Sequence, residues 1–311
     1  MRIHNVSIRI AKTLIVLILV ADVFWCLYHY YSPFHVVALA LVGRSPDCAL
    51  GQTIRGFQSN LRHDAVAKRL WGEIRLVEKD PAGFQLWETP GGRLWAPNSD
   101  AMLLSHLLSE EENRIYGRGE HGIRPGDIVL DCGAHVGVYT REALAEGARL
   151  VVAIEPAPDN VECLRRSFAA EIAAHRVIVC AKGVWDKDDF LTLNVYPGNS
   201  ARDSFVIDWK EAQAGAKVPL TTIDNLVSEL KLERVDFIKM DIEGAERRAL
   251  AGARGTLAEY RPRLAIAAYH LPDDPEVIPR VVSSTWSGYR MGCGPCYEYN
   301  YVIRPGVLYF R

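Results

Sequence analysis

The chain has 311 residues, of which 36 are lysine or arginine and 38 are aspartate or glutamate, so its formal net charge at pH 7 is −2. This balance argues against a nucleic-acid-binding protein, which normally carries a basic stripe. The length suffices for a full hydrophobic core and about two domains. We expect an N-terminal membrane anchor (1–45), a lead-in region (46–125) and a C-terminal α/β domain (126–311).

The first predicted element is an apolar segment over residues 13–31. It holds 19 residues with a single charged side chain, Asp22. As a helix it is about 28 Å long, close to the roughly 30 Å hydrocarbon core of a bilayer. Aromatic residues from Trp25 onward gather at its far end, as in an interfacial belt. We predict a transmembrane helix, with a cleaved signal peptide and a buried soluble helix as the alternatives.

The flanks of this segment bear on its orientation. Arg2, Arg9 and Lys12 precede it and few basic residues follow, so the positive-inside rule places the rest of the chain outside the cytoplasm. A second apolar run, 34–42, follows Pro33 and is too short to span a bilayer alone. If that run returns to the same leaflet, the rest of the chain faces the cytosol.

The lead-in region contains a predicted β-hairpin and a helix. Two short strands within residues 83–95 flank a turn at 90–92. Ser99 and Asp100 can cap a helix that runs through Ser109 with its leucines roughly on one face.

Residues 127–137 are the most informative stretch of the chain. An apolar run ends in Asp131, a small-residue turn spans 133–137, and a helix is predicted over 139–146. A buried parallel strand that leads through a tight loop into a helix is where an open α/β sheet binds an adenosine-containing ligand. A second apolar run, 150–154, ends in Glu155, whose acceptor-only carboxylate suits the two hydroxyls of a ribose.

The spacing of the loop favours S-adenosylmethionine over a dinucleotide. Dinucleotide folds prefer G-x-G-x-x-G, which lets the backbone close on a pyrophosphate. Here the spacing is G-x-x-x-G, and Asp131 stands just before it. An acid at that place repels a pyrophosphate but suits the cationic amino group of a methionine. An ordinary strand–turn–helix is the alternative explanation.

A cluster of charges follows a further apolar strand at Phe237 and Ile238. Parallel sheets bind ligands beyond the carboxyl ends of their strands, so these charges should lie beside the glycine loop. A solvated turn at the start of a helix is the alternative. The charged residues of this cluster are Lys239, Asp241, Glu243 and Glu246.

Together these segments resemble the FkbM-like family of S-adenosylmethionine-dependent methyltransferases. The resemblance is carried by residues 129–137, by 154–156 with Asn160, by 220–224 and by 238–246, and it spans roughly 115–311. It implies a class I methyltransferase fold, a doubly wound α/β sheet of seven mostly parallel strands. One departure is His135, where the family usually has asparagine.

The resemblance also implies roles for individual residues. The loop after the first strand cradles the methionine part of S-adenosylmethionine, and the second strand end holds the ribose. Asp241 and Glu243 lie near the sulfonium and the acceptor. The implied cofactor-binding residues are Asp131, Gly133, Ala134, His135, Gly137, Glu155, Pro156 and Asp241. Tyr116 and Arg118, which follow the lead-in helix, either line the mouth of the pocket or serve in packing.

His270 ends another apolar strand, and the family has a comparable histidine there. We predict that it is the general base that accepts the acceptor's proton, because histidine titrates nearest neutrality. The predicted catalytic residues are therefore His270, Asp241, Glu243 and Lys239. No metal is assigned. Two alternatives stay open: a divalent metal bound by Asp241, Glu243 and His270, or a purely structural histidine.

The seven cysteines are odd in number and irregular in spacing, which predicts no disulfide framework, as in a reducing compartment. Cys293-Gly-Pro-Cys296 has the thioredoxin active-site sequence. We interpret it as a structural turn in a last antiparallel strand pair, closed by residues 306–310. A redox pair and half of a zinc site are the alternatives.

The sequence thus predicts a membrane-anchored methyltransferase that uses S-adenosylmethionine to methylate a hydroxyl of a small molecule, sugar or lipid-linked glycan. Because the donor is a cytosolic metabolite, we expect the α/β domain to face the cytosol. Two other functions stay open. A nicotinamide-dependent oxidoreductase would need pyrophosphate contacts that the Asp131 loop disfavours, and a non-catalytic membrane scaffold would bind an adenosine ligand without turnover.

Overall fold

The computed structural model describes residues 2–97 and 101–311, and the chain divides into two compact units. The first, called here the N-terminal unit, comprises the residues up to Ser59 together with Cys296–Arg304. The second, the sheet unit, comprises Asn60–Pro295 and Pro305–Arg311.

The N-terminal unit consists of helices and one β-hairpin. Helix α1 (Arg2–Tyr30) is followed by α2 (Ser32–Leu41), with a bend of 104° between their apolar parts. The predicted break at Pro33 is confirmed, since this proline lies in the first turn of α2, where its missing amide is tolerated. The unit is completed by the first residues of α3 (Leu50–Glu73) and by the hairpin of β13 (Cys296–Tyr299) and β14 (Val302–Pro305).

Within the described part of the chain, neither α1 nor any other single helix combines the length and apolarity needed to cross a bilayer; only α1 and α2 together, as a bent pair, reach that threshold. The single transmembrane helix predicted over 13–31 is therefore not supported. The large apolar side chains of α1 that the structure describes, from Leu14 to Leu27, are exposed nonetheless.

A disulfide between Cys48 and Cys296 joins the two chain segments of the N-terminal unit. Leu39 and Ile303 pack around the bond in a small buried cluster. The prediction of no disulfide was wrong, because the partners lie 248 positions apart and spacing alone gives no sign of their pairing. Cys293 ends one strand and Cys296 begins another in a different sheet, so the bond does not join the two cysteines of the motif.

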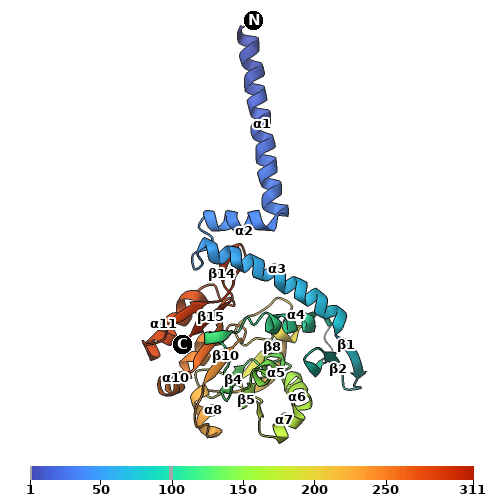
Figure 1. The fold of residues 1–311 in the computed structure, drawn as a ribbon, viewed down its shortest axis with the longest axis vertical. Helices are drawn as coiled ribbons and strands as arrows, with labels where there is room; N and C mark the ends of the chain where they lie inside the picture. The colour runs from blue at the N-terminus through green and yellow to red at the C-terminus, as the bar shows by residue number, and fades with distance from the viewer. Residues whose placement is uncertain (1, 98–100) are drawn as a thin grey trace. The chain divides into compact units, whose positions relative to one another are not determined.

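The sheet unit is built on a seven-stranded sheet with the order β12-β15-β11-β10-β4-β5-β6. Of these strands, Figure 1 labels β15, β10, β4 and β5. Only β15 runs antiparallel to its neighbours, so the predicted mostly parallel α/β sheet and its antiparallel closing pair are confirmed. The strands are β4 (Ile128–Cys132), β5 (Leu150–Ile154), β6 (Val177–Cys180), β10 (Phe237–Met240), β11 (Arg263–Ala267), β12 (Met291–Cys293) and β15 (Val307–Phe310).

Helices cover both faces of this sheet. Successive strand residues point to opposite faces, and here both sets are apolar and need to be covered. Ile128 and Leu130 join a cluster with residues of α8 to α11, whereas Val129 packs on the other face with Tyr139 and Ala143 of α5. The helices are α5 (Val138–Ala145), α6 (Pro158–Ser167), α7 (Ala169–Ala173), α8 (Ile223–Glu229), α9 (Glu246–Ala251), α10 (Arg254–Tyr260) and α11 (Asp274–Thr285).

The predicted hairpin of the lead-in region is confirmed as β2 (Phe84–Thr89) paired with β3 (Gly92–Pro97). The predicted helix is α4 (Ala101–Glu112), and its predicted caps, Ser99 and Asp100, lie outside the described residues. Helix α3 and a third strand, β1 (Arg75–Lys79), were not predicted. A smaller sheet also contains β7 (Gly183–Val184), β8 (Asp189–Val195) and β9 (Gln213–Thr221).

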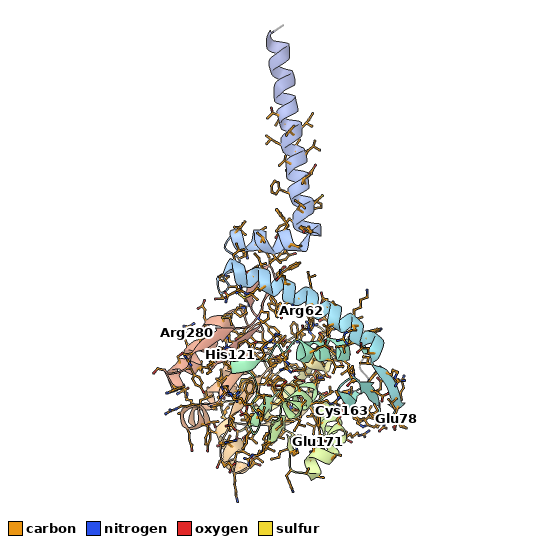
Figure 2. All side chains as sticks on the ribbon, in the orientation of Figure 1. Arg62, Glu78, His121, Cys163, Glu171 and Arg280 are labelled. Carbon is orange, nitrogen blue, oxygen red and sulfur yellow. A yellow bond between two sulfur atoms is a disulfide. The ribbon has the colours of Figure 1, made fainter. Side chains whose placement is uncertain are left out.

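A second buried cluster ties the lead-in hairpin to the sheet unit's core. Leu94 of β3 packs in it with Leu164 and Cys163 of α6. Cys163 is labelled in Figure 2. The backbone amide of Trp95 donates a hydrogen bond to Ser167 Oγ, 2.9 Å away. The lead-in hairpin thus packs as part of the sheet unit.

Candidate active site

The carboxyl ends of four neighbouring strands present the predicted site residues in one row. In sheet order, β11 leads toward His270, β10 to Asp241 and Glu243, β4 to Gly133, and β5 to Glu155. The prediction that the charged cluster lies beside the glycine loop is confirmed. Parallel strands place their ligand sites at this edge.

Lys239 and Asp131 stand directly opposite each other on β10 and β4 and point to the same face of the sheet. Their Nζ and Oδ1 atoms are 3.2 Å apart, and both side chains are buried. Burial alone would lower the pKa of Lys239, but the carboxylates of Asp131 and Asp241 outweigh it and raise the pKa above its usual range. The lysine is therefore a permanent buried cation beside the loop.

This ion pair fixes the loop, and only its lysine reaches the cavity. Lys239 Nζ donates a hydrogen bond to the Gly133 carbonyl at 2.7 Å, and Asp131 Oδ2 accepts one from Thr140 Oγ at 2.6 Å. Asp131 is not among the residues that line the cavity, whereas Lys239 is. The ion pair thus holds the Gly133 carbonyl, and with it the start of the loop, in place.

Two features of the loop explain its residue types. Gly133 has a φ of +78°, and a Cβ on it would stand 1.9 Å from the Asp241 carbonyl oxygen. Only glycine lets the loops after β4 and β10 approach so closely. His135 has a φ of 50°, a left-handed conformation that asparagine and histidine tolerate better than most residues.

The His135 side chain is held by Ser200, with Nε2 and Oγ 2.8 Å apart. Burial first, and the nearby Lys239 charge second, lower the pKa of His135 to about 4. Its imidazole is therefore neutral at physiological pH.

Glu155 lies at the tip of β5 with both carboxylate oxygens oriented by the protein. Oε2 accepts the backbone amide of His135 at 2.9 Å, and Oε1 accepts the amide of Ala157 at 3.0 Å and Asn160 Nδ2 at 3.3 Å. Burial raises the pKa of Glu155, and these donors act in the opposite direction. A fixed carboxylate with remaining lone pairs suits hydroxyl donors of a ligand.

A cavity of about 920 Å³, counting space open to solvent, runs along these strand ends. Its walls mix apolar side chains, such as Val138, Ile154 and Val184, with charged groups from the strand ends. Predicted residues that line it are Tyr116, Gly133, Ala134, His135, Glu155, Pro156, Lys239, Asp241 and Glu243. Arg118, Gly137 and His270 are not among its lining residues.

Three acidic residues that the sequence reasoning missed also line the cavity: Glu110 and Glu111 of α4, and Asp203. Burial first, and the Asp241 charge second, raise the pKa of Glu110 to about 8. Burial likewise raises the pKa of Asp203 to about 7. On a helix with leucines on one face, two adjacent glutamates look like solvent-facing residues. The nearby Lys239 charge lowers the pKa of both glutamates and so partly offsets the effect of their burial.

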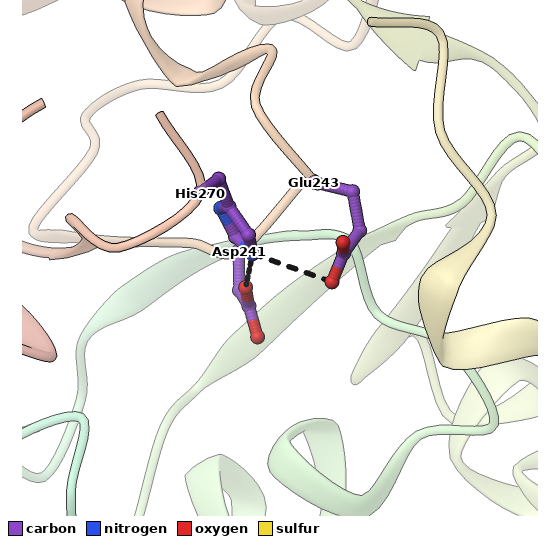
Figure 3. Close-up of side chains that lie close together, drawn as sticks. All are labelled: Asp241, Glu243 and His270. Carbon is purple, nitrogen blue, oxygen red and sulfur yellow. Dashed lines mark ion pairs between the residues drawn. The ribbon is translucent and has the colours of Figure 1, made fainter. Parts of the chain in front are cut away.

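Asp241, Glu243 and His270 lie together at the ends of β10 and β11 (Figure 3). His270 Nε2 is 3.4 Å from Asp241 Oδ1 and 3.3 Å from Glu243 Oε1. On the other side of the ring, Nδ1 is 2.9 Å from Glu246 Oε1. The Tyr116 hydroxyl donates to Asp241 Oδ2 at 2.6 Å.

These neighbours change what His270 can do. Burial would lower its pKa, but the carboxylates of Glu246 and Glu243 outweigh burial and raise the pKa well above its usual value. An imidazole that holds a proton cannot accept another. The predicted general-base role of His270 therefore requires some other positive charge to neutralise the carboxylates around it.

Sequence comparison links the chain to known proteins. Residues 131–289, more than half of the chain, match the methyltransferase FkbM domain. The chain is 28% identical to the 31-O-demethyl-FK506 methyltransferase FkbM of Streptomyces tacrolimicus, over 45% of this chain and 64% of that protein. It is 27% identical to the AMB antimetabolite synthetase AmbE of Pseudomonas aeruginosa, over 45% of this chain and 8% of that protein.

Among solved structures, a methyltransferase FkbM from Methylobacillus flagellatus aligns with a TM-score of 0.47 and 19% identity, covering 83% of this chain and 59% of that one. The chain spans less than two thirds of the length of each of these three proteins. On the match over 131–289, the chain belongs to the family defined by the methyltransferase FkbM domain.

Proposed function

We propose that the protein is an S-adenosylmethionine-dependent methyltransferase that methylates a hydroxyl group of a small molecule, sugar or lipid-linked glycan. The observation that carries this proposal is the Glu155 carboxylate, held by three donors at the tip of β5 beside the Gly133 loop. A carboxylate so placed suits the two hydroxyls of a ribose. Family membership supports methyl transfer as the reaction class.

The residues around the cavity fit the remaining parts of this cofactor. The apolar walls at Ile154 and Val184 suit an adenine ring, and Lys239 and the surrounding acids supply charge where the amino acid part would lie. When bound, S-adenosylmethionine supplies a methyl group on a sulfonium. The chain's residues would orient donor and acceptor in line and exclude water, which is where most of the rate acceleration of such a displacement comes from.

Isothermal titration of the full chain in detergent tests the cofactor. We expect micromolar binding of S-adenosylmethionine and S-adenosylhomocysteine, and no binding of NAD. Glu155→Gln should weaken binding about 100-fold, because two hydrogen bonds from hydroxyls to a charged acceptor are lost or reduced. The matched control is Asp159→Asn, an exposed acid four positions along the chain, which should bind like the unaltered protein.

Two results would contradict the proposal. Binding of NAD in place of S-adenosylmethionine would favour an oxidoreductase. Binding of S-adenosylmethionine without transfer of labelled methyl to any hydroxyl of a broad acceptor panel would favour a scaffold.

We also propose that the N-terminal unit attaches the protein to a lipid membrane. Leu14, Leu17 and Phe24 of α1 are each more than half exposed, and the same holds for most apolar residues between them. The full chain should float with phosphatidylcholine–phosphatidylglycerol vesicles, and Leu17→Glu with Phe24→Glu should abolish flotation. Leu61→Glu, at an equally exposed leucine of α3, is the control. Flotation of all three proteins alike would contradict the proposal.

We place the sheet unit on the cytosolic side, where the methyl donor is made. The bond between Cys48 and Cys296 opposes this placement, because disulfides persist in oxidising compartments. Thiol alkylation in intact cells distinguishes the two sides of the membrane. Recovery of the pair in a partly reduced state agrees with the cytosol, and a fully oxidised pair contradicts it.

A further inference from the structure

In the cluster of Asp241, Glu243 and His270, two buried polar atoms lie at ion-pair distance but make no hydrogen bond. His270 Nε2 and Asp241 Oδ1 make no hydrogen bond, although they face each other across 3.4 Å. The His270 side chain is only 3% exposed, so water does not compensate. Buried polar atoms that make no hydrogen bond are uncommon and call for an explanation, such as a bound ion.

The hydrogen bonds around the cluster orient the His270 ring so that Nε2 faces Asp241 Oδ1. Glu246 Oε1 accepts the backbone amide of Ile242 at 3.0 Å and lies 2.9 Å from His270 Nδ1, which places the imidazole proton on Nδ1. Nε2 then faces the carboxylates of Asp241 and Glu243. A proton on Nε2 can balance these two charges, and a divalent metal ion held between the three groups would displace that proton.

The distances match those around a bound metal ion. Metal bonds of about 2.1 Å to nitrogen and oxygen separate neighbouring ligand atoms by about 3.0–3.4 Å. The two Nε2-to-oxygen distances, 3.3 and 3.4 Å, fall in this range. One ligand atom from each of the three residues lies within 4.8 Å of the others (Figure 3).

Further residues orient two of the three ligands, Asp241 and His270, as ligands are oriented in metal sites. Tyr116 donates to Asp241 Oδ2 and leaves Oδ1 available, and Glu246 orients the imidazole through Nδ1. Carboxylates that fix the ring of a ligating histidine in this way raise its affinity for metal.

We propose that Asp241, Glu243 and His270 bind a divalent metal ion, for which Mn²⁺ is the best-suited probe. Two carboxylates and one imidazole form a mixed donor set that accepts Mn²⁺. Asp241 and Glu243 also line the cavity, so a metal ion held by them would be accessible to a ligand in the cavity. Such an ion would bind the acceptor oxygen and lower the pKa of its hydroxyl.

The role in transfer rests on the proposed function, whereas metal binding does not. The acceptor's O–H bond breaks and its proton passes to water. The oxygen then forms a bond to the methyl carbon as the bond from that carbon to sulfur breaks, which leaves a neutral thioether.

Electron paramagnetic resonance with Mn²⁺ on the EDTA-treated full chain tests the site without measuring activity. We expect micromolar binding, weakened at least tenfold by Asp241→Asn, Glu243→Gln and His270→Phe. Asp241→Asn keeps an oxygen for the Tyr116 hydroxyl and is the variant least disturbing to the fold. The matched controls are the exposed Asp208→Asn, Glu211→Gln and His175→Phe, which should bind as the unaltered protein does.

Absence of bound Mn²⁺ in the unaltered protein, or equal affinity in the site variants, would overturn the metal site. A parallel titration of the EDTA-treated protein with S-adenosylmethionine separates the two proposals. If the cofactor binds and Mn²⁺ does not, the metal site fails and the proposed function stands. If Mn²⁺ binds and the cofactor does not, the metal site stands and the proposed function fails.

Discussion

Lys239→Met should lower the free energy of unfolding by about 3–5 kcal/mol, because it leaves the Asp131 carboxylate buried without its partner. The Gly133 carbonyl loses its hydrogen bond at the same time. The loop is then no longer fixed, so binding of S-adenosylmethionine should be lost as well. Urea denaturation monitored by circular dichroism measures the first effect, and isothermal titration measures the second.

The chain offers a matched control for this prediction. Lys187 and Asp189 form an ion pair of the same chemistry on the surface, with side chains 65% and 40% exposed. Lys187→Met should leave the urea midpoint unchanged. The double variant Lys239→Met with Asp131→Leu should regain much of the lost stability without regaining cofactor binding. A single variant as stable as the unaltered protein would show that the buried pair is not needed for the fold.

Cys48→Ala should destabilise the N-terminal unit by about 2–5 kcal/mol, because the bond to Cys296 closes a very long loop in the unfolded chain. The β13–β14 hairpin, which the bond ties to the helices of that unit, should lose protection first. Hydrogen exchange of residues 296–304 under oxidising conditions measures the effect.

Cys26→Ala is the control for the disulfide, since Cys26 is exposed on α1 and forms no disulfide. Exchange rates in that variant should equal those of the unaltered protein. Unchanged exchange over 296–304 in Cys48→Ala would mean that the hairpin is held without the bond.

The strands of the sheet could be predicted because their signal is local. Residues 150–154 form a continuous apolar run that ends in an acid, and the structure has a buried strand there with Glu155 at its tip. It could also be predicted that the charged cluster lies beside the glycine loop, because parallel strands bind ligands at their common carboxyl edge. Both predictions need only the local sequence and this property of parallel sheets.

Features that depend on distant partners could not be predicted. Glu110 and Glu111 have the sequence context of solvent-facing helix residues, and their place on the cavity depends on how α4 packs over the strand ends. Asp131 was expected to face the cofactor, but its oxygens are occupied by Thr140 and Lys239. Nothing near these residues in the chain indicates such partners.

The hairpin Cys296–Arg304 belongs to the same unit as the first helices, which bears on how a shortened version of the protein behaves. Removal of residues up to about 45 would delete Leu39 from the cluster that buries Ile303 and the disulfide. Removal up to Cys48 would leave Cys296 without its disulfide partner. This second truncated protein should form covalent dimers through the Cys296 thiol unless Cys296 is replaced as well.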